Sequence, residues 1–277
     1  MAVRWVYRKP QWGELVEWHA LHMPRPGGEW WFNDGAATLV TDASSNNAHG
    51  TFGTGQTWVT TDIGSAVNFA GNGIINAGDN DLLLGTRATF VLCMTPNLAG
   101  TSTIAGVLNK RDAFNSNAAY SLGFNYYGGS NEFGCDIGTG TGGAGYAAYT
   151  CSSNGWMTGG TVTRHVVATY DAGRAAGGRI RFYVNGVQVT ATVKDEGAPT
   201  IINTSANIRF GQVNSTGSYY YTGILHYALV FPDALDGDVP ALQGPWPIWQ
   251  PTYYSFASAA TSALPAIMAH YRRLRSA

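Results

Sequence analysis

The chain has 277 residues, of which 45% are apolar, 13% aromatic and 12% charged, and its net charge is −1. This length suffices for one substantial core, and 36 glycines with few charges are typical of short strands joined by tight turns. The chain contains no run of about 18 apolar residues, so we expect no membrane-spanning helix. The charged N-terminus lacks the apolar region of a secretory signal. The basic residues are few and form no stripe, which argues against a nucleic-acid partner.

The two ends of the chain differ from its middle in charge and in aromatic content. Residues 1–26 carry a net charge of +2 and residues 241–277 of +3, which leaves −6 for the residues between them. Because solvated tails are poor in aromatic residues, we expect both ends to dock on a protein surface. The candidate docking residues are Trp5, Trp12, Trp18, Trp246, Trp249, Arg272 and Arg273.

These differences divide the chain into an N-terminal arm (1–26), a central domain (27–240) and a C-terminal docking tail (241–277). Trp12, Leu15, Val16 and Ala20 fall at helical spacing and predict a short amphipathic helix in the arm. An irregular arm with scattered anchors is the alternative. His19 and His22 lack a nearby third ligand, so we expect no metal there.

The first half of the central domain contains four short motifs in a fixed order. An aromatic segment, WWFNDG, occupies residues 30–35, and residues 41–51 read TDASSNNAHGT. Residues 64–71 read GSAVNFAG, and residues 84–90 read LGTRATF and lead into an apolar strand. Each motif is weak by itself, and their order along the chain is what is informative.

A cluster of oxygen-bearing side chains follows Gly78. Calcium takes six to eight oxygen ligands, so Asp79 and Asp81 are candidate calcium ligands. The alternative is turn chemistry, in which Asp and Asn side chains bond to nearby backbone. We expect no other cofactor.

The second half of the central domain contains a β-hairpin that can be read from residue types. Ile180, Phe182 and Val184 alternate with polar residues, Asn185 and Gly186 supply a two-residue turn, and the alternation then resumes. A strand ending in ATYD precedes the hairpin. The short strand NIRFGQ and the long apolar strand YTGILHYALVF follow it.

In this order, the motifs of residues 27–240 resemble laminin-G-like (concanavalin A-like lectin/glucanase) domains. The resemblance implies an all-β fold, a jelly-roll β-sandwich of two antiparallel sheets. It also implies a binding or structural role. His226 stands where the family usually has an acid, so a role that depends on that acid is not carried over.

The same sandwich hosts glycoside hydrolases, which need two opposed carboxylates. The closest pair, Glu132 and Asp136, is four residues apart, which places both on one face of a strand, and we interpret it as a solvated edge. No G-x-S-x-G motif occurs, and the glycine-rich run 138–145 lacks the Lys-Ser/Thr of a phosphate-binding loop. We therefore expect no enzymatic activity.

The cysteines are expected to be buried thiols that act as small hydrophobes. A bridge between Cys135 and Cys151, which could face each other across neighbouring strands, is the alternative.

Tyrosines suggest a glycan site, because aromatic rings stack on the C–H faces of sugars. The candidates are Tyr219, Tyr220, Tyr221 and Trp156, accompanied by Tyr126, Tyr127, Tyr146 and Tyr149. In strands, however, half of such residues must point inward, where aromatic pairs stabilise the core.

The tail supplies a second resemblance. Residues 235–251 contain Pro245-Trp246 and Trp249-Gln250-Pro251, and they resemble the tails of bacteriophage structural proteins that carry laminin-G-like domains. The prolines predict an extended segment that displays both tryptophans.

Two functions follow from these patterns. The first is a non-enzymatic bacteriophage virion protein made in the host cytoplasm, most plausibly a capsid decoration or head-fibre protein. Its arms would anchor it to the major capsid protein or another virion protein, and homo-oligomers are expected. The second is a glycan-binding lectin module of a tail or host-attachment protein. Neither function involves a membrane.

Overall fold

The computed structural model describes residues 15–16, 24–36, 38–100, 102–113, 116–138, 145–156, 158–213, 219–236 and 253–254. These residues form strands and turns with no α-helix among them, and every pairing between the strands is antiparallel. No helix of the described residues is long and apolar enough to cross a membrane. The predicted all-β sandwich is confirmed.

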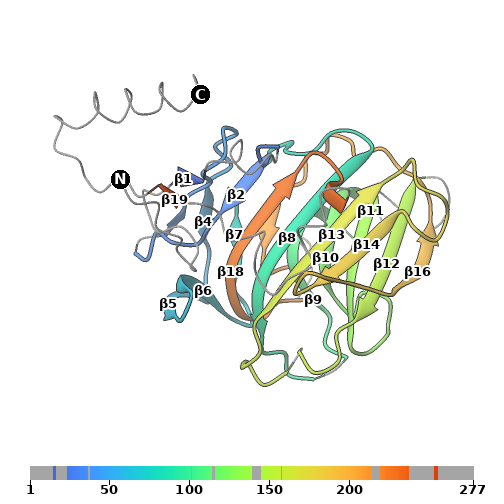
Figure 1. Ribbon diagram of the computed structural model, residues 1–277. Coiled ribbons are helices and arrows are strands. Elements are labelled where there is room, and N and C mark those ends of the chain that lie inside the picture. Colours follow the sequence, from blue (N-terminus) through green and yellow to red (C-terminus); the bar gives the residue numbers. More distant parts are fainter. Residues whose placement is uncertain are drawn as a thin grey trace, which may run out of the picture.

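Two large sheets pack face to face (Figure 1). The nine-stranded sheet has the order β16 (Ala191–Glu196), β12 (Tyr146–Ser152), β11 (Glu132–Gly138), β10 (Ser116–Phe124), β9 (Ala105–Ala113), β17 (Ile208–Phe210), β7 (Ile75–Asn76), β4 (Gly50–Phe52) and β3 (Leu39–Val40). In the eight-stranded sheet the order is β15 (Val187–Val189), β14 (Ile180–Val184), β13 (Arg164–Asp171), β8 (Arg87–Pro96), β18 (Thr222–Phe231), β6 (Gly64–Ala70) and β5 (Gln56–Thr61), and β2 (Gly28–Trp30) also pairs with β18.

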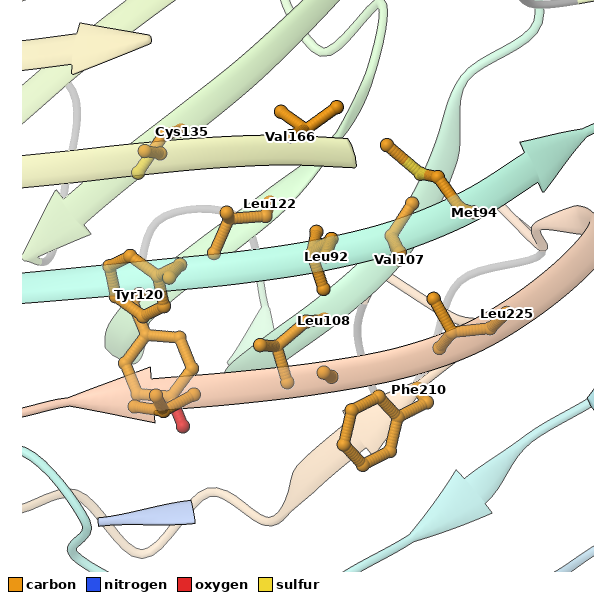
Figure 2. Packing of buried hydrophobic residues seen from close by; sticks show 14 of the residues in the cluster. Leu92, Met94, Val107, Leu108, Tyr120, Leu122, Cys135, Val166, Phe210 and Leu225 are labelled. Atoms are coloured by element: carbon orange, nitrogen blue, oxygen red, sulfur yellow. The ribbon is translucent and has the colours of Figure 1, made fainter. Parts of the chain in front are cut away.

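The main core fills the space between the sheets because alternate side chains of each strand point inward. Leucines and other aliphatic side chains from both sheets interlock there (Figure 2). Aromatic rings extend this core, since Trp30 and Phe32 both form T-shaped contacts with Phe210, at centroid distances of 5.0 and 5.4 Å. The aromatic motif at residues 30–35 thus supplies core residues.

The eight-stranded sheet is buried on its outer face as well. A second apolar cluster there contains Trp31, Val91, Cys93, Leu229 and Phe231, which alternate with main-core residues along their strands. Strand β8 therefore reads as a nearly continuous apolar run, as expected for a strand covered on both faces.

The predicted hairpin is confirmed. Strands β14 and β15 pair with Val184 opposite Val187, and Asn185 and Gly186 both have positive φ, of 51° and 81°. These are the angles that a type I′ turn requires, and Asn and Gly adopt them at the lowest cost. Asn185 also accepts a hydrogen bond from the amide of His165, which ties the turn to β13.

Two interpretations of the chain ends and thiols are now decided in part. Leu15–Val16 forms strand β1, which pairs with β19 (Tyr253–Tyr254), so the predicted helix is wrong at these two residues. A strand replaces it because backbone pairing with the distant tail overrides local spacing. All three cysteines are buried thiols outside any disulfide, as expected, and Cys135 and Cys151 are not opposite each other but face Tyr149 and Phe133.

His165 on β13 should make stability depend on pH. It is buried beside Tyr227, and burial lowers the pKa of its imidazole to about 3. The unfolded chain takes up this proton near pH 6.5 and the folded chain does not, so the free energy of unfolding should fall as the pH drops from about 6.5 towards 3. We expect this loss to be on the order of 2–4 kcal/mol.

The His165→Phe substitution should remove this part of the pH dependence of the free energy of unfolding. Urea unfolding of both proteins at a series of pH values measures it. Identical pH profiles for the two proteins would contradict the assignment to His165.

Candidate functional site

The outer face of the nine-stranded sheet carries a line of polar side chains. Strand register places Asp136 of β11 opposite Ser121 of β10, and Ser121 opposite Asn109 of β9. Their neighbours Cys135 and Leu108 belong to the main core, so alternation turns these three side chains away from the other sheet. We call Asp136, Ser121 and Asn109 the polar row.

The polar row is buried although it lies on an outer face. Asp136 is only 1% exposed, and Ser121 and Asn109 are equally covered. Tyr126 and Tyr127 cover it from the segment after β10, and both remain half-buried. Gly123 makes room for this cover, because a Cβ at that position would lie 2.2 Å from the hydroxyl oxygen of Tyr126.

Hydrogen bonds tie the tyrosines to the polar row. Tyr127 donates its hydroxyl proton to Oδ1 of Asp136 at 2.5 Å, and Tyr146 donates to Oδ2 at 3.0 Å. Tyr126 donates to Oδ1 of Asn109 at 3.0 Å, and Ser121 donates to the same oxygen. The amide of Asn109 in turn donates to the carbonyl of Gln212 at 2.7 Å. The hydrogen bonds thus form two groups, one around the carboxylate of Asp136 and one around the side-chain amide of Asn109.

A buried guanidinium balances the negative charge of Asp136. Arg111 lies one outward position beyond Asn109 on β9, and its Nη1 is 3.5 Å from Oδ2 of Asp136. Burial raises the pKa of Asp136, while Arg111 and the two tyrosine hydroxyls act in the opposite direction. Burial, followed by the charge of Asp136, raises the pKa of Tyr127 and Tyr146, so both phenols stay protonated donors.

The interpretation of Glu132 and Asp136 as a solvated edge is wrong for Asp136, because the tyrosine cover excludes solvent from it. Glu132 pairs with Lys194 at 2.8 Å. The two carboxylates do share one face, but four residues of a strand span ~13 Å, which exceeds the separation used by either class of glycosidase.

The predicted tyrosine site is divided by the structure. Tyr221 (0% exposed) and Trp156 (4% exposed) lie in the main core, where they contact Phe69 and Phe124, and they present no ring face to solvent. Tyr219 is 37% exposed and Tyr220 is half-buried, beside the start of β9.

The predicted calcium ligands meet a lysine instead of an open site. Oδ1 of Asp79 and Oδ1 of Asp81 lie 2.6 and 3.4 Å from Nζ of Lys110. Within the described part of the chain, no group of three or more His, Cys, Asp or Glu residues could hold a metal ion. The docking residues Trp5, Trp12, Trp18, Trp246, Trp249, Arg272 and Arg273 lie outside the described residues, so their role stays a prediction.

The reading of the sequence missed Arg111, Asn109 and Ser121. A signal was present, because Asn109, Lys110, Arg111 and Asp112 are four consecutive polar residues in strand β9, and the first three are buried. Such a run in a buried strand indicates that hydrogen-bond or ion-pair partners lie on both faces of the strand, because buried polar groups are paired.

The chain belongs to the concanavalin A-like lectin/glucanases superfamily. The family model, Laminin_G_3, matches residues 69–238, which is more than half of the chain. This confirms the laminin-G-like resemblance, although the motifs before residue 69 lie outside the matched range. None of the curated protein sequences is detectably similar.

Solved structures share the fold at low sequence identity. The binding domain of Paraclostridial Mosquitocidal Protein 1 has a TM-score of 0.55 and 14% identity, with 78% of this chain and 51% of that chain covered. The receptor binding domain of botulinum neurotoxin mosaic serotype C/D has a TM-score of 0.55 and 12% identity, with 78% and 49% covered. The chain thus spans about half the length of these two toxin domains.

A third similar structure is domain 4 of AbnA, an extracellular GH43 arabinanase from Geobacillus stearothermophilus, in complex with arabinotriose. Its TM-score is 0.52 and its identity 16%, with 79% of this chain and 98% of that chain covered. At such identities the likeness concerns the fold.

The polar row predicts a specific stability result. Asp136→Ala should lower the free energy of unfolding by about 3–5 kcal/mol, because it leaves Arg111 without its charge partner and two tyrosines without an acceptor. A double replacement, Arg111→Met with Asp136→Leu, should recover much of this loss.

Urea unfolding measures the free energy of unfolding of both variants. Ser121→Ala is the control, because it removes one neutral hydrogen bond, worth about 1 kcal/mol. An Asp136→Ala variant as stable as the wild type would contradict this prediction, because it would mean that water reaches Arg111.

Proposed function

We propose that this protein is a non-enzymatic carbohydrate-binding protein whose ligand binds on the outer face of the nine-stranded sheet. The observation that carries the proposal is the polar row beneath the half-buried rings of Tyr126 and Tyr127. Sugar sites combine ring faces for C–H surfaces with fixed hydroxyl, amide and carboxylate groups for the sugar hydroxyls. Here the polar row holds the tyrosines in place, and Glu132 of β11 and Lys194 of β16, on either side of β12, add charged groups.

Fold and family support a binding role. Superfamily membership covers both lectins and glucanases, and domain 4 of the arabinanase AbnA, which has this fold, is solved with an oligosaccharide. The spacing of Glu132 and Asp136, together with the sealed environment of Asp136, speaks for binding rather than hydrolysis.

Glycan-array screening of the full chain, followed by calorimetry on the best glycan, tests the proposal. Tyr127→Ala should weaken binding at least tenfold, which corresponds to about 1.4 kcal/mol, because it removes a ring face and a hydroxyl. Tyr219→Ala is the comparison variant, since it removes an exposed tyrosine that lies beside the start of β9. Loss of binding only in the Tyr219 variant would move the site there, and no binding to any glycan would refute the proposal.

A second proposal concerns where the domain is displayed. We propose that it belongs to a bacteriophage virion, as a capsid decoration or head-fibre protein made in the host cytoplasm. The resemblance of residues 235–251 to phage structural tails favours this, and pairing of β1 with β19 brings the two arms together. Basic ends on an acidic domain would favour contact with an acidic shell protein. Repetition on a symmetric particle, as a homo-oligomer or as many copies, would add avidity.

Co-sedimentation with purified particles, read by quantitative mass spectrometry, tests the virion role. The double variant Trp246→Ala with Trp249→Ala should bind particles at least tenfold more weakly, because buried aromatic anchors contribute about 2 kcal/mol each. Its glycan binding should be unchanged, since neither tryptophan belongs to the polar row or to the tyrosines that cover it. Absence of the wild-type protein from particles would exclude the virion role and leave the lectin role standing.

A further inference from the structure

Lys110 is a buried ammonium surrounded by oxygen atoms. Its side chain is 2% exposed, and Nζ donates to Oδ1 of Asp79 at 2.6 Å and to the carbonyls of Thr204 and Ala206 at 3.0 and 2.8 Å. Oδ1 of Asp81 lies 3.4 Å away on the same nitrogen. We call Asp79, Asp81 and the two carbonyls the oxygen cage.

The oxygen cage is built from three parts of the chain. Lys110 comes from β9, the aspartates from the segment between β7 and β8, and the carbonyls from the segment before β17. Backbone hydrogen bonds between Ala77 and Ile208 (2.9 Å) and between Ile208 and Gly78 (2.8 Å) hold the last two segments together. The cage is therefore positioned by the fold independently of the lysine side chain.

The chemistry of the cage is that of a calcium site. Calcium prefers carboxylate and carbonyl oxygens and completes its shell of six to eight ligands with water. Two carboxylates and two carbonyls converge here, and two further buried oxygens nearby, the hydroxyl groups of Tyr120 and Thr204, have no hydrogen-bond partner in the protein. Tyr120 of β10 is the residue opposite Lys110 in the pairing of β10 with β9.

As the chain stands, however, the residues do not fit a calcium ion, because the three protons of the ammonium already use three of the four oxygens. We propose that Lys110 takes the place of a divalent cation in this domain, so that its fold needs no calcium, and that removing the lysine side chain converts the oxygen cage into a calcium site. Ligand binding by the domain is then independent of calcium as well.

Thermal unfolding of the full chain, in EDTA and in rising calcium concentrations, tests this inference. The wild-type Tm should not change with calcium. Lys110→Ala should have a lower Tm in EDTA and a Tm that rises with each tenfold increase in calcium, as mass action requires of a ligand that binds only the folded state. Lys110→Met should be destabilised without rescue, because its side chain still fills the cage.

Two further variants and one spectroscopic signal sharpen the test. Lys194→Ala removes a lysine that pairs with a carboxylate on the same sheet, and the Tm of this variant should not change with calcium concentration. Adding Asp79→Asn and Asp81→Asn to Lys110→Ala should abolish the rescue. Terbium luminescence sensitised by Tyr120 should appear in the alanine variant and be absent from the wild type.

A wild-type Tm that rises with calcium would overturn the inference. A folded Lys110→Ala variant whose Tm does not change with calcium would overturn it as well. If the alanine variant fails to fold, Lys110→Ser offers a second small side chain, and the wild-type measurements still decide the first half of the inference. None of these readouts uses a glycan, so the outcome is independent of the proposed carbohydrate binding.

Discussion

The alternation of side chains in paired strands is the constraint on which the rest of this structure depends. Register is regular from β12 through β10, and it stays regular between Tyr120–Leu122 of β10 and Leu108–Lys110 of β9, so inward residues form one core and outward residues form one line there. The eight-stranded sheet uses its outer face for a second apolar cluster. The nine-stranded sheet uses its outer face for the polar row, which is therefore the chemically distinctive face of the sandwich.

Local patterns predicted a large part of the fold. The turn at Asn185 and Gly186 and the strands around it depend on residues that are neighbours in the sequence, and the structure has them as expected. The order of motifs in residues 27–240 indicated the family, and the family model confirms it. The helix expected near Val16 failed because its strand partner, Tyr253, is far away in the chain.

The candidate site was much less predictable, because register between distant strands creates it. Nothing near Asp136 in the sequence indicates that Arg111 and Tyr146 will meet it. Composition identified tyrosines as interesting, but only pairing decides that Tyr221 points into the core and Tyr127 covers the polar row. The sequence likewise suggested Asp79 and Asp81 as calcium ligands, and only the pairing of distant segments shows that Lys110 of β9 contacts both carboxylates.

The pairing of β2 with β18 has a mechanical consequence. Gly28 near the start of the sandwich lies opposite Val230 near its end, so the chain enters and leaves at the same end of two adjacent strands. A load applied between these two points would open the β2–β18 ladder one hydrogen bond at a time, instead of shearing many bonds together. The three-residue strand β2 would give way first, because β18 is also held by β8 up to Phe231, so the rest of the eight-stranded sheet would keep its pairing.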